Sequence, residues 1–399
     1  MPYIDQSRFA AGQPEVQPES EPTASFGLDA DQPRGRLPPD RIGVHLCLEA
    51  VLLLGFAILL FALFRSDAAP FATGQRRDAM IVVVVALLLT AMASAVALRV
   101  GTVNLAVGAI AAGAGMLFAE NTARGLPMAL AIALGAALAA GAVLVLLAVV
   151  LRAPGWLAGA AVTGVIALWL WQHVDLTRQT VAPLSSLAAS QAWIWLVSIG
   201  ALSIVGGVVG ALGGWRSRLG ECRKAAASGG RRDGATIATT ITALLMSALL
   251  AGMAGVWLIW TAAPTQVFMP MRLDPVLLTG FGLAAALLGG TSALGRRGGI
   301  LGTLAASLLL ATVLALSIVD EWRLHPLWLI LAAIGVGIIV TRLVDTLGRP
   351  DRRWHDDEPP TMMEPARYDA TVEEYDARYR GADIDPYRGA AGHDGYRYQ

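Results

Sequence analysis

The chain has 399 residues, of which 55% are hydrophobic and only 15% are charged, and its mean hydropathy is +0.58. This composition is too apolar for an ordinary water-soluble domain, so it predicts a membrane protein. The formal net charge is zero, but residues 1–43 and 347–399 hold 31 of the 60 charged side chains. These acidic ends flank a basic, apolar middle, and we expect no nucleic-acid partner.

Residues 1–43 form the first predicted unit, a disordered cytoplasmic tail that is polar and rich in proline. No apolar run follows a short basic start, so this segment does not resemble a cleaved signal peptide. The first predicted membrane span begins close behind it.

Residues 44–346 form the predicted transmembrane domain. A hydrocarbon layer of about 30 Å requires about 20 helical residues. Ten apolar stretches fit this length, at 46–64, 79–98, 103–119, 127–151, 155–172, 191–213, 236–262, 275–293, 298–319 and 326–344. Apart from Glu49 and edge residues such as Arg99 and Arg342, these stretches hold no ionisable side chain. The predicted fold class is therefore an all-α polytopic membrane protein with about ten transmembrane helices.

The distribution of basic residues predicts the orientation of these helices, because Lys and Arg in short flanking loops stay in the cytoplasm. With both termini cytoplasmic, 17 basic residues fall on the inner side and seven on the outer side. Eight tryptophans fall at predicted outer ends. An interfacial aromatic belt is the first explanation for them, and a docking surface for an extracellular partner is the alternative.

Glycines at four-residue spacing, Gly206, Gly210 and Gly214, predict a close contact between helices. Simple bundle packing is one interpretation of this pattern. The other interpretation is a pair of helices that slide past each other.

The sequence lacks the groups that covalent chemistry requires. It has no P-loop, no Ser-His-Asp set in one region and no metal-ligand spacing, and Cys47 and Cys222 make no disulfide framework. No carboxylate is expected at the middle of a span, where an ion-driven carrier generally needs one. We therefore predict a transport subunit without enzymatic activity or cofactor, driven by a partner.

Three stretches carry a family resemblance. Residues 101–109 read GTVNLAVGA, residues 288–303 read LGGTSALGRRGGILGT, and the basic loop 219–230 reads LGECRKAAASGG. They resemble patterns like GGIDLSVGS, LGGTSxxGGxGxxxGT and GGNxxAAxxSGI of ABC-importer permeases for ribose-like sugars and, more distantly, for branched-chain amino acids. The resemblance covers residues 80–345. Thr102, Asn104 and Ala106 replace Gly, Asp and Ser of the first pattern. Glu221, Lys224 and Gly230 depart from the third.

The resemblance implies the membrane subunit of a binding-protein-dependent ABC importer in the cell membrane, with a ribose-like sugar as substrate. The implied partners are ABC ATPase subunits, an extracytoplasmic solute-binding protein, and a second copy of the chain or a sibling permease. The implied substrate-pathway residues are Thr102, Asn104 and Gly108. The implied ATPase-coupling residues are Gly220, Arg223, Lys224, Ala225, Ser228 and Gly229. The implied glycine turn between two spans comprises Gly289, Gly290, Thr291 and Ser292.

Several alternatives stay open at this point. The substrate could be a branched-chain amino acid or a nucleoside, and the chain could instead be a self-sufficient secondary transporter or channel, or a membrane scaffold. Asn104 could serve only to cap a helix or tie two spans together. Residues 347–399 hold six of the seven tyrosines among acidic residues and form the third predicted unit, a disordered cytoplasmic tail.

Overall fold

Helices make up nearly all of the part of the chain that the computed structural model describes, which comprises residues 42–66, 74–173, 191–228, 233–261, 274–292, 300–319 and 325–347. Contacts divide the chain into Met1–Asp40 and Arg41–Gln399, and every described residue belongs to the second unit. No strand occurs in these ranges. Nearly all of both predicted tails lies outside them.

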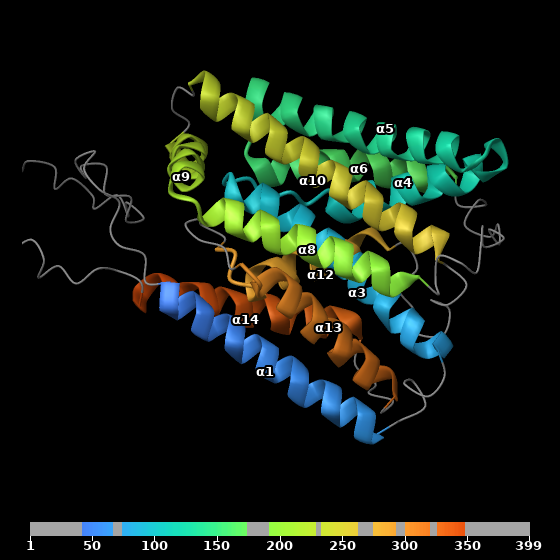
Figure 1. Ribbon diagram of the computed structural model, residues 1–399. Helices are drawn as coiled ribbons and strands as arrows, with labels where there is room; N and C mark the ends of the chain where they lie inside the picture. The colour runs from blue at the N-terminus through green and yellow to red at the C-terminus, as the bar shows by residue number, and fades with distance from the viewer. Residues whose placement is uncertain are drawn as a thin grey trace, which may run out of the picture. The chain divides into compact units, whose positions relative to one another are not determined.

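The helices follow the predicted stretches in chain order (Figure 1). They are α1 (Ile42–Ser66), α3 (Gly74–Arg99), α4 (Val107–Asn121), α5 (Leu126–Val145), α6 (Gly155–Gln172), α8 (Ala192–Ala211), α9 (Gly213–Ser228), α10 (Gly234–Trp260), α12 (Pro275–Leu288), α13 (Gly302–Val319) and α14 (Pro326–Leu347). A 3-10 turn, Thr122–Arg124, follows α4, and a π-helical turn, Leu146–Val150, extends α5. Each of the ten predicted stretches contains most of one apolar helix, and α9 is a helix that composition did not predict.

Seven of the described helices are long and apolar enough to cross a membrane, namely α1, α3, α5 with its π-helical extension, α6, α8, α10 and α14. The other apolar helices are α4 with 15 residues, α12 with 14, and α13, whose described apolar part Gly302–Ser317 is shorter than the seven. Large apolar side chains on the long helices are exposed, as at Leu54 (61%) and Val165 (70%). Because a hydrocarbon environment accommodates such surface, the structure is that of a multi-pass helical membrane protein.

Helix α3 forms the centre of the bundle. It packs against α8, α10, α12 and α13, and nearly all of its side chains from Val82 to Ala95 are buried. Its sequence is apolar all the way round, which is the pattern of a helix enclosed by others.

The ends of α3 and α12 share one sequence pattern and one geometry. Residues Ala97–Thr102 read ALRVGT and residues Ala286–Thr291 read ALLGGT. In each hexapeptide the N–H of the sixth residue donates to the carbonyl of the first (3.1 and 3.0 Å), and that of the fifth donates to the second (2.9 and 3.0 Å). The fifth residue, Gly101 or Gly290, has a φ of 76° or 84°, which a side chain would disfavour. Both helices therefore end in a Schellman motif.

The predicted glycine contact is made by a different glycine. A Cβ atom added at Gly206 or Gly214 would have no neighbour within 4 Å, and one at Gly210 would meet only the Arg99 side chain. A Cβ atom at Gly207 would lie 2.6 Å from the Ile300 carbonyl oxygen. The prediction of a close helix contact at Gly206, Gly210 and Gly214 is therefore wrong, because in the described part of the chain only the Arg99 side chain of α3 reaches this side of α8, and Gly214 belongs to α9.

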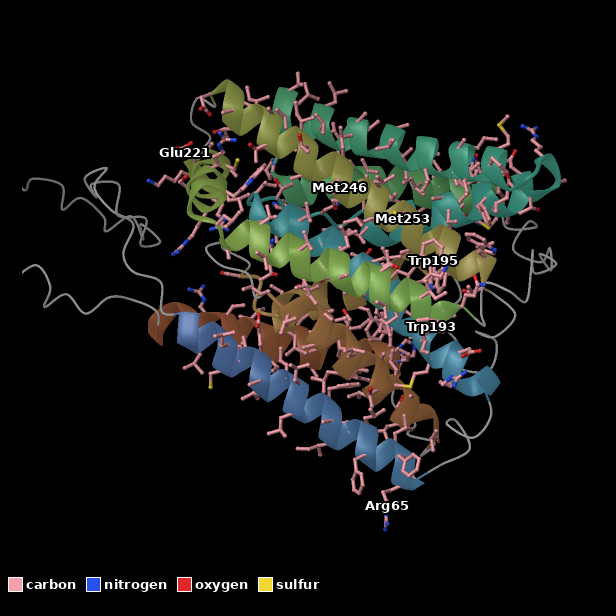
Figure 2. The ribbon with its side chains drawn as sticks, in the orientation of Figure 1. Arg65, Trp193, Trp195, Glu221, Met246 and Met253 are labelled. Atoms are coloured by element: carbon pink, nitrogen blue, oxygen red, sulfur yellow. The ribbon has the colours of Figure 1, made fainter. Side chains whose placement is uncertain are left out.

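Six of the eight tryptophans at the predicted outer ends divide into two groups; of the others, the Trp169 ring centroid lies 4.7 Å from that of the His173 ring, and Trp322 lies outside the described residues. One group is exposed and comprises Trp171 (75%), Trp193 (57%) and Trp328 (65%). The other group packs inward: the Trp195 ring centroid lies 5.5 Å from that of Trp257 and 6.3 Å from that of Trp260. Figure 2 shows Trp193 and Trp195 near the same end of α8. Only the exposed group has the placement of an interfacial belt.

The orientation of the bundle is a testable prediction. With Cys47 and Cys222 replaced, a cysteine at Ser185 is expected to react with a membrane-impermeant thiol reagent in intact cells, because the arginine distribution places it outside. A cysteine at Ser228 is expected to react only after permeabilisation. The reverse pattern of labelling would invert the assignment of both faces.

Candidate functional site

A non-helical segment, Val100–Ala106, connects α3 to α4 and is named here the unwound segment. Thr102, Asn104 and Ala106 are at most 6% exposed. Asn104 contacts Ser247, which lies halfway along α10, so the segment reaches the middle of the bundle. At membrane depth, non-helical backbone is tolerated only where protein buries it or water lines it.

Asn104 joins three elements through its side-chain amide. Its Oδ1 accepts a hydrogen bond from the Ala106 N–H at 2.9 Å, which shapes the turn into α4. Its Nδ2 donates to Ser247 Oγ at 3.0 Å. Ser247 Oγ donates in turn to the Ala93 carbonyl of α3 at 2.7 Å. The amide of Asn104 thus ties α10 and α3 to the start of α4.

Two threonines fix the other end of the unwound segment. The Leu105 carbonyl accepts from Thr163 Oγ1 of α6 at 3.1 Å and from Thr279 Oγ1 of α12 at 3.3 Å. Thr279 Oγ1 also accepts from the Gly108 N–H at 2.9 Å. These hydroxyls satisfy backbone groups that a continuous helix would have paired.

Glycines let the neighbouring helices approach the unwound segment. A Cβ atom at Gly108 would overlap the Pro275 carbonyl oxygen, and one at Gly155 would overlap the Thr102 side chain. A Cβ atom at Gly159 would lie 2.5 Å from the Leu105 nitrogen. The structure therefore brings Thr102, Asn104 and Gly108 together in one place enclosed by α6, α10 and α12, and their role in a substrate pathway stays a prediction.

The loop predicted to couple to an ATPase contains α9, seen nearly end-on at one end of the bundle in Figure 1. Arg223 Nε donates to the Arg99 carbonyl at 3.0 Å. A Cβ atom at Gly101 would lie 3.2 Å from Ala226 Cβ and 3.3 Å from Arg223 Cα. The helix therefore rests directly on the point where α3 ends and the unwound segment begins.

The predicted coupling residues have different surroundings. Arg223 faces α3, Ala225 is partly buried, Lys224 is exposed, and a Cβ atom at Gly220 would have no neighbour within 4 Å. The Ser228 side chain and Gly229 lie outside the described residues. Glu221 is exposed at the α9 end of the bundle, where Figure 2 labels it.

Asp233 sets the start of α10 beside α9. Its carboxylate caps the helix by accepting from the Thr236 N–H at 3.0 Å. Hydrogen bonds from the Thr236 side chain and backbone lower the pKa of the Asp233 carboxyl. In the same region Cys222 Sγ donates to the Thr236 carbonyl at 3.7 Å, which fixes α9 against the first turn of α10.

The predicted glycine turn lies where α12 and α13 meet. A Cβ atom at Gly302 would overlap the Gly289 carbonyl oxygen, so the two backbones are in direct contact. Gly290 supplies the positive φ of the α12 terminus, and Thr291 and Ser292 are buried. The four predicted residues therefore form the end of α12, and residues 293–299, which complete the predicted turn, lie outside the described residues.

Glu49 of α1 is a buried carboxylate for which the sequence predicts no particular role. It is 3% exposed, and its Oε1 accepts from the backbone N–H groups of Leu301 at 2.9 Å and Gly302 at 3.2 Å. A carboxylate at a helix N-terminus satisfies unpaired N–H groups and interacts favourably with the helix dipole. The sequence did carry a signal that Glu49 has a role, because no other acidic residue lies within a predicted span.

Three hydroxyl residues that bond the unwound segment could not be predicted from the sequence, namely Ser247, Thr163 and Thr279. Each is a single hydroxyl in an apolar helix, and its partner in the unwound segment lies 143, 58 or 174 residues away in the sequence. In a sequence, these hydroxyls cannot be told from hydroxyls that bond the backbone of their own helix.

Comparison of the chain with protein-family models, with curated proteins and with solved structures found no match to any of them.

Proposed function

We propose that the chain is the membrane permease subunit of an ATP-driven, binding-protein-dependent importer in the cell membrane, with a ribose-like sugar as substrate. It crosses the membrane ten times with both termini in the cytoplasm. The observation that carries the proposal is the contact of α9 with the unwound segment. It links a basic helix at the end of the bundle to polar groups in its interior.

The coupling argument follows from this contact. An ATPase dimer that closes on nucleotide would push on α9, and a packed helix passes such a displacement to its neighbours because close-packed interfaces deform little. Arg223 bonds the carbonyl of Arg99, five residues before Asn104. A displacement of α9 therefore acts first on the segment that holds the predicted pathway residues.

The substrate argument rests on the polar groups around the unwound segment. The amide of Asn104 and the hydroxyls of Ser247, Thr163 and Thr279 provide donors and acceptors inside a mostly apolar bundle. Such groups suit a small, hydroxyl-rich solute if the helices separate and expose them. Nucleosides and branched-chain amino acids are the alternative substrates.

The rival function is a secondary transporter. The observation that favours it is the buried Glu49, since a buried carboxylate is a group through which an ion gradient can act.

Affinity purification is expected to recover an ABC ATPase and a second permease copy or sibling, and vesicles holding this complex are expected to take up sugar only with ATP and a solute-binding protein. Gradient-driven uptake by the chain alone, abolished in Glu49→Gln, would replace the importer by the carrier.

Substitution in α9 tests the coupling step. Arg223→Ala is expected to retain ATP hydrolysis by the assembled complex but to lower ATP-driven uptake about tenfold, because it breaks a charge-assisted hydrogen bond of about 1.5–3 kcal/mol. The exposed Glu221→Gln on the same helix is the matched control and is expected to leave both rates unchanged. Normal uptake by Arg223→Ala would reduce α9 to a connector.

A further inference from the structure

The apolar surface of α8 continues into the start of α9. Val205, Val208 and Leu212 are 56%, 45% and 54% exposed, and Trp215, on the first turn of α9, is 44% exposed. In a multi-pass membrane protein, such a strip faces lipid acyl chains. Tryptophan concentrates at the level of the lipid headgroups. Trp215 therefore marks where the hydrocarbon-facing surface of α8 ends.

Arg218 places a positive charge beside this tryptophan. Its guanidinium carbon lies 5.9 Å from the centroid of the Trp215 ring, within range of a cation–π interaction. Arg218 is exposed, and α9 as a whole carries four basic residues against the single acidic Glu221. The exposed end of the strip is therefore electropositive.

Arg99 adds a second guanidinium along α8. Its Nη1 donates to the Gly206 carbonyl at 3.0 Å, and a Cβ atom at Gly210 would lie 2.5 Å from the same nitrogen. The missing side chain at Gly210 thus makes room for the guanidinium. Within the described ranges, no carboxylate forms an ion pair with Arg99 or Arg218.

We propose that the end of α8 and the first turns of α9 bind the headgroup of an anionic phospholipid. The acyl chains lie along the strip from Val205 to Leu212, Trp215 sits at the interface, and Arg218 attracts the phosphate. The Arg99 guanidinium adds a positive charge beside the strip, at Gly206 and Gly210. Arginine donates in a fork that matches phosphate oxygens, and basic residues beside the membrane favour anionic lipids. The continuity of the apolar strip with the charged end favours a lipid over a protein, because one molecule of lipid satisfies both. This site does not rest on the proposed transport function.

Native mass spectrometry of the purified full-length chain tests the proposal, with phosphatidylglycerol and phosphatidylcholine offered at equal concentration. The wild type is expected to retain phosphatidylglycerol preferentially, and less of it at high salt. Arg218→Gln is expected to lower the affinity for phosphatidylglycerol about fivefold, as the loss of one basic contact predicts. Arg65→Gln is the matched control, since Arg65 is an exposed arginine at the other end of the bundle (Figure 2).

Three results would overturn the site. They are unchanged phosphatidylglycerol affinity in Arg218→Gln, an equal loss in Arg65→Gln, and competition by soluble glycerophosphoglycerol at the concentration at which the lipid binds. Melting curves without added lipid check that the variants fold. If Arg218→Gln were unstable, Trp215→Leu provides the second arm and is expected to weaken retention of both lipids, whereas unchanged retention would contradict the interfacial role of Trp215.

Discussion

Gly255→Ala is expected to destabilise the bundle by about 3 kcal/mol, at the upper end of the usual cost of overpacking. A Cβ atom at Gly255 of α10 would overlap the carbonyl oxygen of Ala111 in α4. Backbone atoms cannot rotate out of the way, so α4 and α10 must move apart. This movement would loosen the packing of the buried apolar cluster to which both helices contribute. Thermal unfolding in detergent, followed by the loss of monodisperse protein, measures the change.

Gly135→Ala is the matched control for this experiment. Gly135 lies in α5, where an added Cβ atom would have no neighbour within 4 Å. The same substitution is therefore expected to stabilise the protein, by about 0.5–1 kcal/mol, since alanine restricts the unfolded chain. Equal melting temperatures for the two variants would contradict the close contact between α4 and α10.

Asn104→Ala is expected to cost about 1–3 kcal/mol of stability, because it leaves the buried Ala106 N–H without its acceptor. Ser247→Ala removes the partner of Asn104 Nδ2 and is expected to cost a similar amount. Since the two side chains bond each other, the double variant is expected to lose less than the sum of the single losses. Melting of the three variants measures this coupling, and strict additivity would show that the bond contributes nothing.

Transport by the same variants separates a structural role from a role in the pathway. Ser247→Ala loosens the unwound segment but leaves Asn104 in place, so it controls for the loss of stability. If Asn104 meets the substrate, Asn104→Ala is expected to lower uptake well below that of Ser247→Ala at equal abundance. Equal uptake in the two variants would remove Asn104 from the pathway.

The helices could be predicted from the sequence because membrane spans depend on one property, a sufficient length of apolar residues. The ends of the helices were less certain: the predicted stretch 275–293 runs past Gly290, whose positive φ ends α12, because apolar length does not mark a left-handed residue. Helix α9 could not be predicted from composition, because its mixture of basic and small residues resembles that of an ordinary basic loop.

The candidate site was predictable only in part. Asn104 stood out as the one strongly polar residue at the start of a short span, but the sequence could not show that Ser247 completes its hydrogen bonds. Gly207 was indistinguishable from Gly206 until the direction of the α8 faces was known. Such pairings depend on how helices are rotated about their axes, which apolar sequences specify weakly because every face is hydrophobic.

The bond between Glu49 and the first N–H groups of α13 fixes the position of α1 along its own axis. Most of the surface of α1 is apolar and exposed, and such a surface would allow a helix to shift along its neighbour at little cost. A shift of one turn, about 5.4 Å, would withdraw Oε1 from Leu301 and Gly302 and leave it, like the buried Oε2, without a hydrogen bond. The two hydrogen bonds of Glu49 therefore set the depth of α1 in the bilayer relative to the rest of the bundle.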